Sequence, residues 1–290
     1  MNIITTPEDM QKTALALKRE GKRIGLVPTM GFLHEGHLSL IKLARRQADV
    51  VILSIFVNPT QFGPHEDFNR YPRNFERDRT MCETAGVDII FNPAPEAMYP
   101  DGYSVYVEEN VLSKGLCGAS RPGHFRGVLT VVAKLFNLTL PDAAVFGQKD
   151  AQQARLIQQM ARDLNFPVTI VLAPIIRESD GLAKSSRNTY LSPAERRDAL
   201  GLQQALKTAR RLYREGERDA QRIIAAMQEG IAQIPSARVD YITIVDRDTL
   251  QRAPRLDTPV LVALAVYIGQ TRLIDNLPLP DGTLSNLHPE

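Results

Sequence analysis

The stretch IGLVPTMGFLHEGHLSLIKLA, residues 24–44, decides the fold. Residues 24–27 form an apolar run that is typical of a buried strand, and the apolar residues after position 37 recur at helical spacing. His34 and His37 therefore lie on a strand-to-helix turn, where we expect free backbone N–H groups and the positive end of a helix dipole. Two imidazoles beside the small Gly36 predict a phosphoryl-binding site. The alternative is a capped helix with one solvent-facing and one packed histidine.

The composition excludes several classes of protein. The chain has 290 residues, 43% of them hydrophobic and 23% charged, which is enough for one large or two medium soluble domains. A net charge of +2 does not indicate a nucleic-acid partner, and we find neither an apolar run long enough to span a membrane nor a signal-peptide pattern. Cys82 and Cys117 are isolated and predict no disulfide or zinc framework. We therefore expect a cytoplasmic protein without a nucleic-acid or membrane partner.

Strands and helices alternate through the first 176 residues. Apolar runs predict strands at residues 24–27, 50–56, 87–91, 143–146 and 168–174. A first helix should begin at the capping segment Thr6-Pro7 and end at Gly21. Further helices are expected at about 36–48, 75–85, 128–138 and 151–164. This alternation predicts an α/β domain over residues 1–176, built on a Rossmann-like, doubly wound parallel sheet.

The pattern changes near Arg177. A polar loop to residue 191 is followed by two charged amphipathic helices, at about 193–214 and 219–234. Strands then follow one another directly, at residues 239–245, 260–268 and 272–276. Helices followed by adjacent strands predict a smaller α+β domain over residues 177–290.

Polar side chains follow the predicted parallel strands at the points where the strands end. Ligands of doubly wound sheets bind at these carboxyl ends, so clusters that are far apart in the sequence should converge there. The clusters are Thr29, Met30, His34 and His37; Asn58, Thr60 and Gln61; Gly147, Gln148, Lys149, Asp150 and Gln153; and Arg177, Asp180 and residues 184–188. Their convergence, more than any single motif, predicts a ligand site at one edge of the sheet.

Two of these clusters also have a purely structural interpretation. Lys149 and Asp150 could belong to a helix cap as readily as to a polyphosphate and ribose site. Residues 185–188 could be a polar surface loop, although two hydroxyls beside Arg187 and Lys184 also suit a phosphate clamp.

The remaining polar residues are open to two interpretations as well. Asn58 and Gln61 could satisfy the backbone of their loop or could orient a small polar substrate. Asp78 stands at the head of a predicted helix, so it could cap that helix or hold Mg²⁺ through water. His124 is interpreted as a helix-cap or subunit-contact residue.

The motifs together resemble those of the pantoate–β-alanine ligase family, which belongs to the HxGH-type nucleotidyltransferase superfamily. The matching segments, in order and spacing, are PTMG at 28–31, HEGH at 34–37, FVNPTQF at 56–62, YPR at 71–73, GHFRG at 123–127, FGQKD at 146–150 and SSRN at 185–188. The resemblance covers essentially the whole chain. The HxGH segment by itself would indicate only adenylyl or cytidylyl transfer.

The resemblance implies ATP-dependent amide formation. Pantoate's carboxylate should attack the α-phosphorus of MgATP and release pyrophosphate, so ATP is a substrate and Mg²⁺ accompanies it. The amine of β-alanine should then attack the pantoyl-adenylate, giving pantothenate and AMP. The resemblance also implies a homodimer formed through the N-terminal domain, with the smaller domain acting as a lid.

The resemblance further implies a role for most of the polar residues. Catalytic residues should be His34, His37, Lys149, Ser185, Ser186 and Arg187. ATP should contact Met30, Gly31, Phe32, Leu33, His34, Glu35, Gly36, His37, Gly147, Gln148, Lys149, Asp150, Ile176, Lys184, Ser185, Ser186 and Arg187. Pantoate should contact Thr29, Met30, Gln61 and Gln153, β-alanine should contact Gln61, and Asp78 is the candidate magnesium ligand.

Three other functions stay open on the sequence alone. A nucleotidyltransferase of the same superfamily would bind a phosphorylated acceptor, for which the amides of Asn58, Gln61 and Gln153 are poorly suited. A class I aminoacyl-tRNA synthetase would need a tRNA-binding surface, and the near-neutral charge argues against one. A silent nucleotide-binding module would be expected to lack some of the phosphate-binding residues.

Lys184 departs from the family's usual pattern, in which an apolar residue precedes the Ser-Ser-Arg step, and its role stays open.

Overall fold

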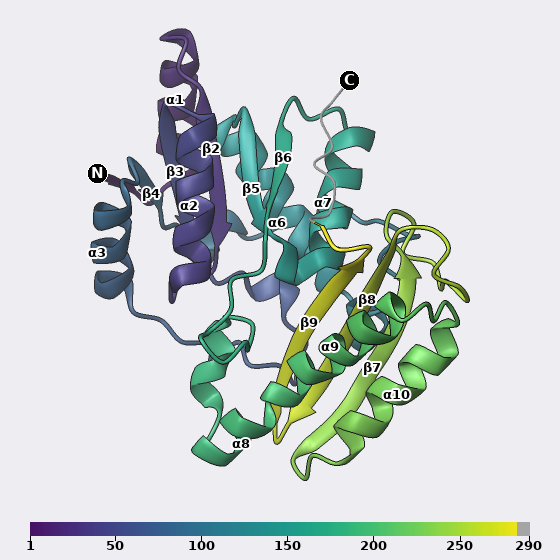
Figure 1. Cartoon of the computed structure of the whole chain (residues 1–290). Helices are drawn as coiled ribbons and strands as arrows, with labels where there is room; N and C mark the ends of the chain where they lie inside the picture. The colour runs from purple at the N-terminus through teal and green to yellow at the C-terminus, as the bar shows by residue number, and fades with distance from the viewer. Residues whose placement is uncertain (283–290) are drawn as a thin grey trace.

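A six-stranded parallel sheet forms the centre of the N-terminal part of the chain in the computed structural model, which describes residues 1–282 (Figure 1). Its strands lie in the order β1-β4-β3-β2-β5-β6. They are β1 (Asn2–Ile4), β2 (Ile24–Thr29), β3 (Val50–Ile55), β4 (Ile89–Phe91), β5 (Ala143–Gly147) and β6 (Thr169–Ala173). After β2, the strands β3 and β4 are added on one side of it, and the strands β5 and β6 are added on the other side. The order therefore reverses between β2 and β5, and such a reversal is where doubly wound sheets bind ligands.

Helices cover both faces of this sheet, as its nearly continuous apolar strands require. On one face, α1 (Pro7–Arg19), α6 (His124–Thr139) and α7 (Ala151–Asp163) share an apolar core with Leu26 and Ile52. On the other face, α2 (Glu35–Gln47) and α3 (Phe75–Ala85) pack on Val27 and Leu53. The short elements between them are η1 (Pro59–Gln61), α4 (Pro95–Met98), α5 (Cys117–Ser120) and η2 (Gln148–Asp150).

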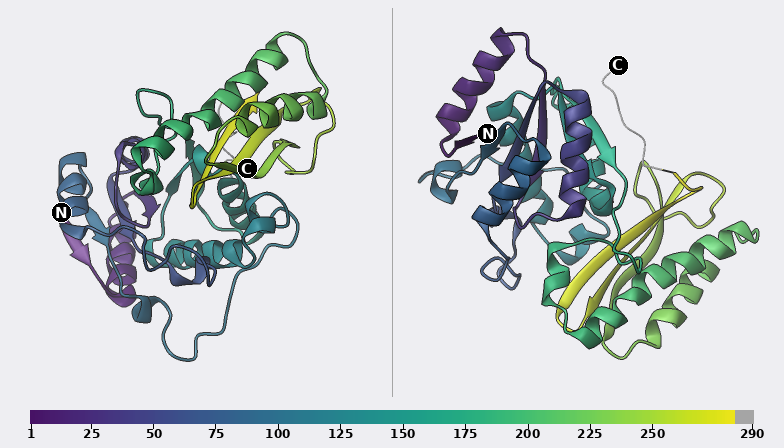
Figure 2. Two further views of the ribbon diagram at one scale, coloured as in Figure 1. Left: turned by 90° about the horizontal axis from the view of Figure 1, so that it is seen from below. Right: turned by 60° about the vertical axis from the view of Figure 1, so that its left-hand side comes forward.

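The C-terminal part of the chain forms an antiparallel sheet with the order β7-β8-β9 (Figure 2). Two helices, α9 and α10, pack on one face of this sheet, while Leu261 and Ala263 on its other face join the apolar core of the N-terminal part. The elements are η3 (Ser186–Tyr190), α8 (Pro193–Asp198), α9 (Leu200–Arg214), α10 (Ala220–Ala232), β7 (Ala237–Asp246), β8 (Val260–Ile268) and β9 (Thr271–Leu279).

The predicted fold class is confirmed, and the element boundaries show where sequence patterns were insufficient. The edge strand β1 was not predicted, because three residues are too few to show a period. The single helix expected at 193–214 is wrong: α8 ends at Asp198, and Ala199 separates it from α9. The domain boundary expected at residue 176 stays a prediction. Within residues 1–282, no helix is both long enough and apolar enough to cross a membrane.

Two leucines test the packing of the N-terminal core. Leu129, in the middle of α6, is fully buried, whereas Leu164, just after α7, is 53% exposed. We expect Leu129→Ala to lower the free energy of unfolding by about 2–5 kcal/mol, because it removes buried methyl groups and leaves a cavity. Leu164→Ala should cost less than about 0.5 kcal/mol. Urea unfolding of the two variants measures both values, and equal costs would contradict the packing described here.

Candidate functional site

A cavity of about 220 Å³ lies at the carboxyl ends of β2 and β5, where the strand order reverses. Four segments that are distant in the sequence meet around it, as the sequence predicted. The polar residues that line it are Thr29, His34, His37, Ser54, Asn58, Gln61, Tyr71, Lys149, Asp150, Gln153, Lys184, Ser185, Ser186 and Arg187, and Met30, Gly36, Gly147 and Ile176 also line it.

The turn between β2 and α2 satisfies several of the backbone donors that we expected to be free. The buried carboxylate of Asp78 accepts the N–H groups of Phe32 and Leu33, at 2.6 and 2.8 Å. The hydroxyl of Thr29 accepts the N–H of Gly31 at 3.1 Å. Phe32 has a positive φ of 50°, which this set of hydrogen bonds holds in place. The turn is thus organised from within, and Asp78 serves as its internal acceptor.

Both histidine rings are fixed by the same turn. The Nδ1 atom of His34 accepts the N–H of Gly36 at 3.1 Å, and the Nδ1 atom of His37 accepts the N–H of His34 at 3.2 Å. A nitrogen that accepts a backbone N–H carries no proton, so each neutral ring must carry its proton on Nε2. The ring centroids lie 4.1 Å apart, and both rings line the cavity. The turn therefore presents two Nε2–H donors, and the histidines both cap the helix and face the site.

The electrostatics of the turn keep both imidazoles neutral. Burial lowers the pKa of His34 to about 4, with the positive charge of Lys149 as the next cause. Burial also lowers the pKa of His37 well below its usual value, and His34 and Lys149 lower it further. Gly36 supports this arrangement, because a Cβ there would lie 2.8 Å from Cε1 of His34.

The segment that follows β6 crosses the cavity and contacts the turn. The hydroxyl of Ser186 donates to the carbonyl oxygen of Phe32 at 3.3 Å. The ammonium of Lys184 lies 3.1 Å from the carboxylate of Glu35, so Lys184, whose role the sequence left open, pairs with a turn residue. The turn after β2 and the segment after β6 thereby form one wall of the cavity together.

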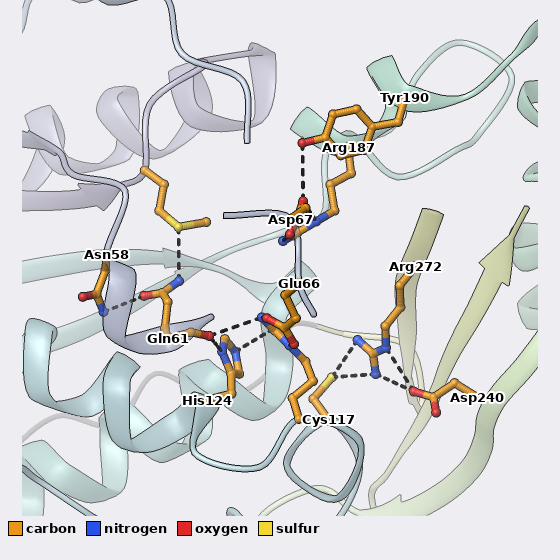
Figure 3. A network of polar contacts seen from close by, with 12 residues as sticks. Asn58, Gln61, Glu66, Asp67, Cys117, His124, Arg187, Tyr190, Asp240 and Arg272 are labelled. Carbon is orange, nitrogen blue, oxygen red and sulfur yellow. Dashed lines mark hydrogen bonds and ion pairs between the residues drawn. The ribbon is translucent and has the colours of Figure 1, made fainter. Parts of the chain in front are cut away.

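A chain of amide hydrogen bonds fixes the orientation of Gln61 (Figure 3). Asn58 uses its Oδ1 to accept from the backbone N–H of Thr60, at 3.4 Å. The amide NH₂ of Asn58 therefore donates, to Oε1 of Gln61 at 3.0 Å and to the carbonyl oxygen of Gly127 at 3.1 Å. This leaves Nε2 of Gln61 as the outward group, 3.1 Å from the sulfur of Met30. Gln61 thus offers a donor to an oxygen-rich ligand.

His124 supports Gln61 from behind, a role that the sequence did not reveal. Its Nδ1 lies 2.8 Å from the carbonyl oxygen of Gln61, and its Nε2 lies 2.9 Å from a guanidinium nitrogen of Arg121. Arg121 can only donate, so Nε2 of His124 accepts and Nδ1 carries the proton. The helix-cap interpretation of His124 was wrong, because its ring bonds Gln61 rather than the free N–H groups of α6.

Some expected ATP contacts do not line the cavity. Leu33 is fully buried in the core, and Gln148 is buried with its carbonyl oxygen bound by Asn276. Gly31, Phe32 and Glu35 belong to the turn but are not among the residues that line the cavity. Asp78 also lies outside the lining, and its role as a magnesium ligand stays a prediction.

The apolar part of the lining was not predicted. One side of helix α6 supplies it, with Phe146 of β5 and Leu40 of α2; the α6 residues are Val128, Val131, Val132 and Leu135. In the sequence these residues are indistinguishable from core positions, because a buried helix shows no polar face. Tyr71, which a long loop brings into the site, carried no signal beyond its YPR motif.

A second cavity, of about 640 Å³, adjoins the first and lies between the second sheet and segments around α5, η2 and the loop after η1. The two cavities share the lining residues Lys149, Asp150, Gln153, Ser185 and Arg187. The second sheet contributes Tyr241, Thr271 and Arg272 to the larger cavity. The phosphate-binding candidates therefore lie where the two cavities meet; we call the smaller cavity, lined by His34 and His37, the inner cavity, and the larger one the outer cavity.

Comparisons with known proteins agree with this geometry. The family model for pantoate-beta-alanine ligase matches residues 2–278. The pantothenate synthetase of Thermotoga petrophila is 56% identical over 276 residues, covering 95% of this chain and 99% of that protein. The pantothenate synthetase of Moorella thermoacetica is 56% identical over 279 residues, covering 96% and 99%.

Solved structures give the same result. The pantothenate synthetase of Thermus thermophilus superposes with a TM-score of 0.91 at 45% identity, over 96% of this chain and 99% of that one. The Francisella tularensis ligase, solved with beta-gamma ATP and beta-alanine, has a TM-score of 0.81 at 35% identity, over 97% and 99%. Because both the sequence and the fold match over at least 95% of the chain, this chain belongs to the pantoate–β-alanine ligase family.

Proposed function

We propose that this chain condenses pantoate with β-alanine at the expense of ATP, through a pantoyl-adenylate, releasing AMP and pyrophosphate. The observation that carries this proposal is the meeting of two kinds of group in one cavity. The neutral imidazoles of His34 and His37 and the cation of Lys149 suit a polyphosphate, and the amide donor of Gln61 suits a small hydroxy acid. The reaction that links the polyphosphate and the hydroxy acid is inferred from the family to which the chain belongs.

In the first step the polyphosphate lies along the His34–His37 turn. The two Nε2–H groups and Lys149 neutralise charge that builds on the phosphates as pantoate's carboxylate attacks the α-phosphorus. Ser185, Ser186 and Arg187 line the same cavity, on the segment that contacts the turn through Ser186. The neutral imidazoles donate hydrogen bonds, and because pantoate's own carboxylate is the nucleophile, no covalent intermediate with the protein is needed.

Pantoate and β-alanine occupy the side of the cavity near Gln61. The Nε2–H₂ of Gln61 donates to pantoate's oxygens, with Gln153, Thr29 and Met30 beside it, and Gln61 also places β-alanine. The apolar side of α6 excludes water, which protects the mixed anhydride from hydrolysis. The bound amine then attacks the acyl carbon and displaces AMP.

The nucleoside lies on the β5 and β6 side of the cavity. Gly147 and Asp150 hold the ribose, and the backbone near Ile176 meets the adenine.

The described residues hold no cluster of three or more histidine, cysteine or acidic side chains that could form a metal cage. We assign Mg²⁺ to the phosphates of its ATP complex, because their oxygens are the ligands that Mg²⁺ prefers, and Asp78 stays the candidate protein ligand. The homodimer formed through the N-terminal domain and the cytoplasmic location are proposed on family resemblance.

The proposed function is tested by AMP formation from MgATP and pantoate, with and without β-alanine. We expect AMP release that depends on β-alanine, with pantothenate identified by its mass. ATP consumption that ignores both substrates, or formation of a dinucleotide, would instead support a nucleotidyltransferase. Tight ATP binding without turnover would identify a silent module.

Lys149→Met tests the phosphate site. The variant keeps most of the length of the side chain but removes one cation from the cavity, so we expect kcat/KM for ATP to fall by about two to three decades, the usual cost of losing one such group. Lys207→Met, on the surface helix α9, is the control and should be unaffected. Steady-state rates with varied ATP measure both, and equal activities would remove Lys149 from the mechanism.

Gln61→Glu tests the donor orientation derived from Asn58. The substitution replaces an NH₂ donor with a carboxylate facing an anionic acid, so KM for pantoate should rise at least about tenfold. KM for ATP should change little, since Gln61 is not among the residues that we propose to contact the phosphates. A variant that raises KM for ATP and leaves KM for pantoate unchanged would show that Gln61 has been assigned to the wrong substrate.

The neutral histidines predict a pH dependence of stability. The folded pKa of His34 and of His124 is about 4, and that of His37 is also lowered, so below pH 6.5 the unfolded chain binds more protons than the folded one. Stability should therefore fall as the pH falls from 7 to 5.5, by about 1 kcal/mol for each of the three histidines.

Urea unfolding at the two pH values measures this loss, with two histidine variants for comparison. His124→Asn should reduce the loss by about one third, because one of the three contributing groups no longer titrates. His65→Asn, at an exposed position, should leave the loss unchanged. A wild-type stability that stays constant or rises toward pH 5.5 would contradict neutral, buried imidazoles.

A further inference from the structure

The long loop between η1 and α3 carries two adjacent acidic residues, each of which pairs with an arginine (Figure 3). Glu66 accepts two hydrogen bonds from Arg121, both 2.6 Å long. Asp67 accepts two from Arg187, both 2.8 Å long. Arg121 belongs to the support behind Gln61, whereas Arg187 faces the phosphate region. One loop thereby contacts both the support of Gln61 and the arginine that faces the phosphate region.

The geometry of the Asp67–Arg187 pair leaves part of the guanidinium available. Asp67 occupies the edge formed by Nε and Nη2 of Arg187, so Nη1 is left for another acceptor. Arg187 lines both cavities, but Asp67 lines only the larger, outer one. The carboxylate therefore lies behind the guanidinium as seen from the inner cavity, where His34 and Lys149 lie.

Further contacts hold this pair rigidly. The hydroxyl of Tyr190 lies 3.4 Å from Asp67 and donates to the carbonyl oxygen of Arg70 at 3.1 Å. The ring of Tyr71 lies beneath the Arg187 guanidinium, with 5.7 Å between the guanidinium carbon and the ring centroid. Only about a quarter of each charged side chain is exposed, at 27% for Arg187 and 20% for Asp67. Breaking such a pair would leave a largely buried charge without a partner.

We propose that Asp67 is a positioning residue: it holds the guanidinium of Arg187 from behind so that the free edge meets the triphosphate, and the pair persists while ATP is bound. This inference rests on the proposed function, which gives the triphosphate its place. A carboxylate that merely occupied the phosphate position until ATP arrived would line the inner cavity, and Asp67 does not. The loop thus fixes the phosphate-binding arginine and, through Glu66 and Arg121, the substrate-binding glutamine.

Asp67→Asn tests the proposal, with Asp240→Asn as the matched control. Asp240 makes two hydrogen bonds to Arg272 and is 18% exposed, but its arginine lies on the second sheet. We expect Asp67→Asn to lower kcat/KM for ATP by about 10- to 100-fold, as the loss of a charge-assisted pair would, with KM for pantoate unchanged. Asp240→Asn should leave KM for ATP unchanged.

A second measurement separates positioning from a structural role. In an Arg187→Ala background, Asp67→Asn should add less than about a twofold further loss, because the residue through which it acts is gone. A full additional loss in that background would overturn the proposal. So would an Asp67→Asn variant with unchanged or tighter ATP affinity, since that would make Asp67 irrelevant to the phosphates or a competitor of them.

Calorimetric binding of a non-hydrolysable ATP analogue to the same variants separates this proposal from the proposed function. Wild-type protein that binds the analogue but forms no pantothenate would contradict the function, and the ratio of affinities between wild type and Asp67→Asn would still decide the role of Asp67. Weaker binding by Asp67→Asn, with normal binding by Asp240→Asn, supports positioning. Equal binding by all three proteins overturns it.

Discussion

The organisation of the site depends on how the turn after β2 satisfies its own backbone donors. A strand-to-helix turn normally offers free N–H groups to an anion. Here Asp78 takes two of them, and the Nδ1 atoms of His34 and His37 take two more. Each imidazole accepts a backbone N–H through its Nδ1 atom. In place of that donor it presents its own Nε2–H, which lies further from the turn. The helix cap and the proposed phosphate contact are therefore the same two rings.

The rest of the site depends on contacts that cross between distant segments. Ser186 and Lys184 contact the turn itself, while Asn276 of β9 donates to the carbonyl oxygens of Gln148 and Lys149. The backbone of Lys149 is thus held by the second sheet, although Lys149 lies in η2, just after strand β5 of the first sheet. A displacement of the C-terminal sheet would change the placement of Lys149 and of the wall that carries Arg187. That the smaller domain acts as a lid stays a prediction from the family resemblance, and this coupling is what would carry such a movement to the site.

Much of the fold, and the location of the site, could be predicted from the sequence, because apolar periodicity and polar residues at strand ends are local signals. The support of the site could not be predicted. Asp78 resembles any acid in the first turn of a helix, and His124 resembles a cap, yet they bond backbone groups 45 and 63 residues away. Asp67 likewise pairs with an arginine 120 residues further on. Such pairings follow from tertiary folding and leave no periodic trace.

The most direct test is nitrogen-15 NMR of the histidine side chains at pH 7, with assignments from His34 and His37 variants. Neutral rings protonated on Nε2 are expected for both residues in the free protein, with pKa values below the ordinary 6.5. Adding an ATP analogue should perturb the Nε2 resonances and leave Nδ1 as an acceptor. Imidazolium signals, or rings protonated on Nδ1, would contradict the proposed conversion of backbone donors into phosphate-binding donors.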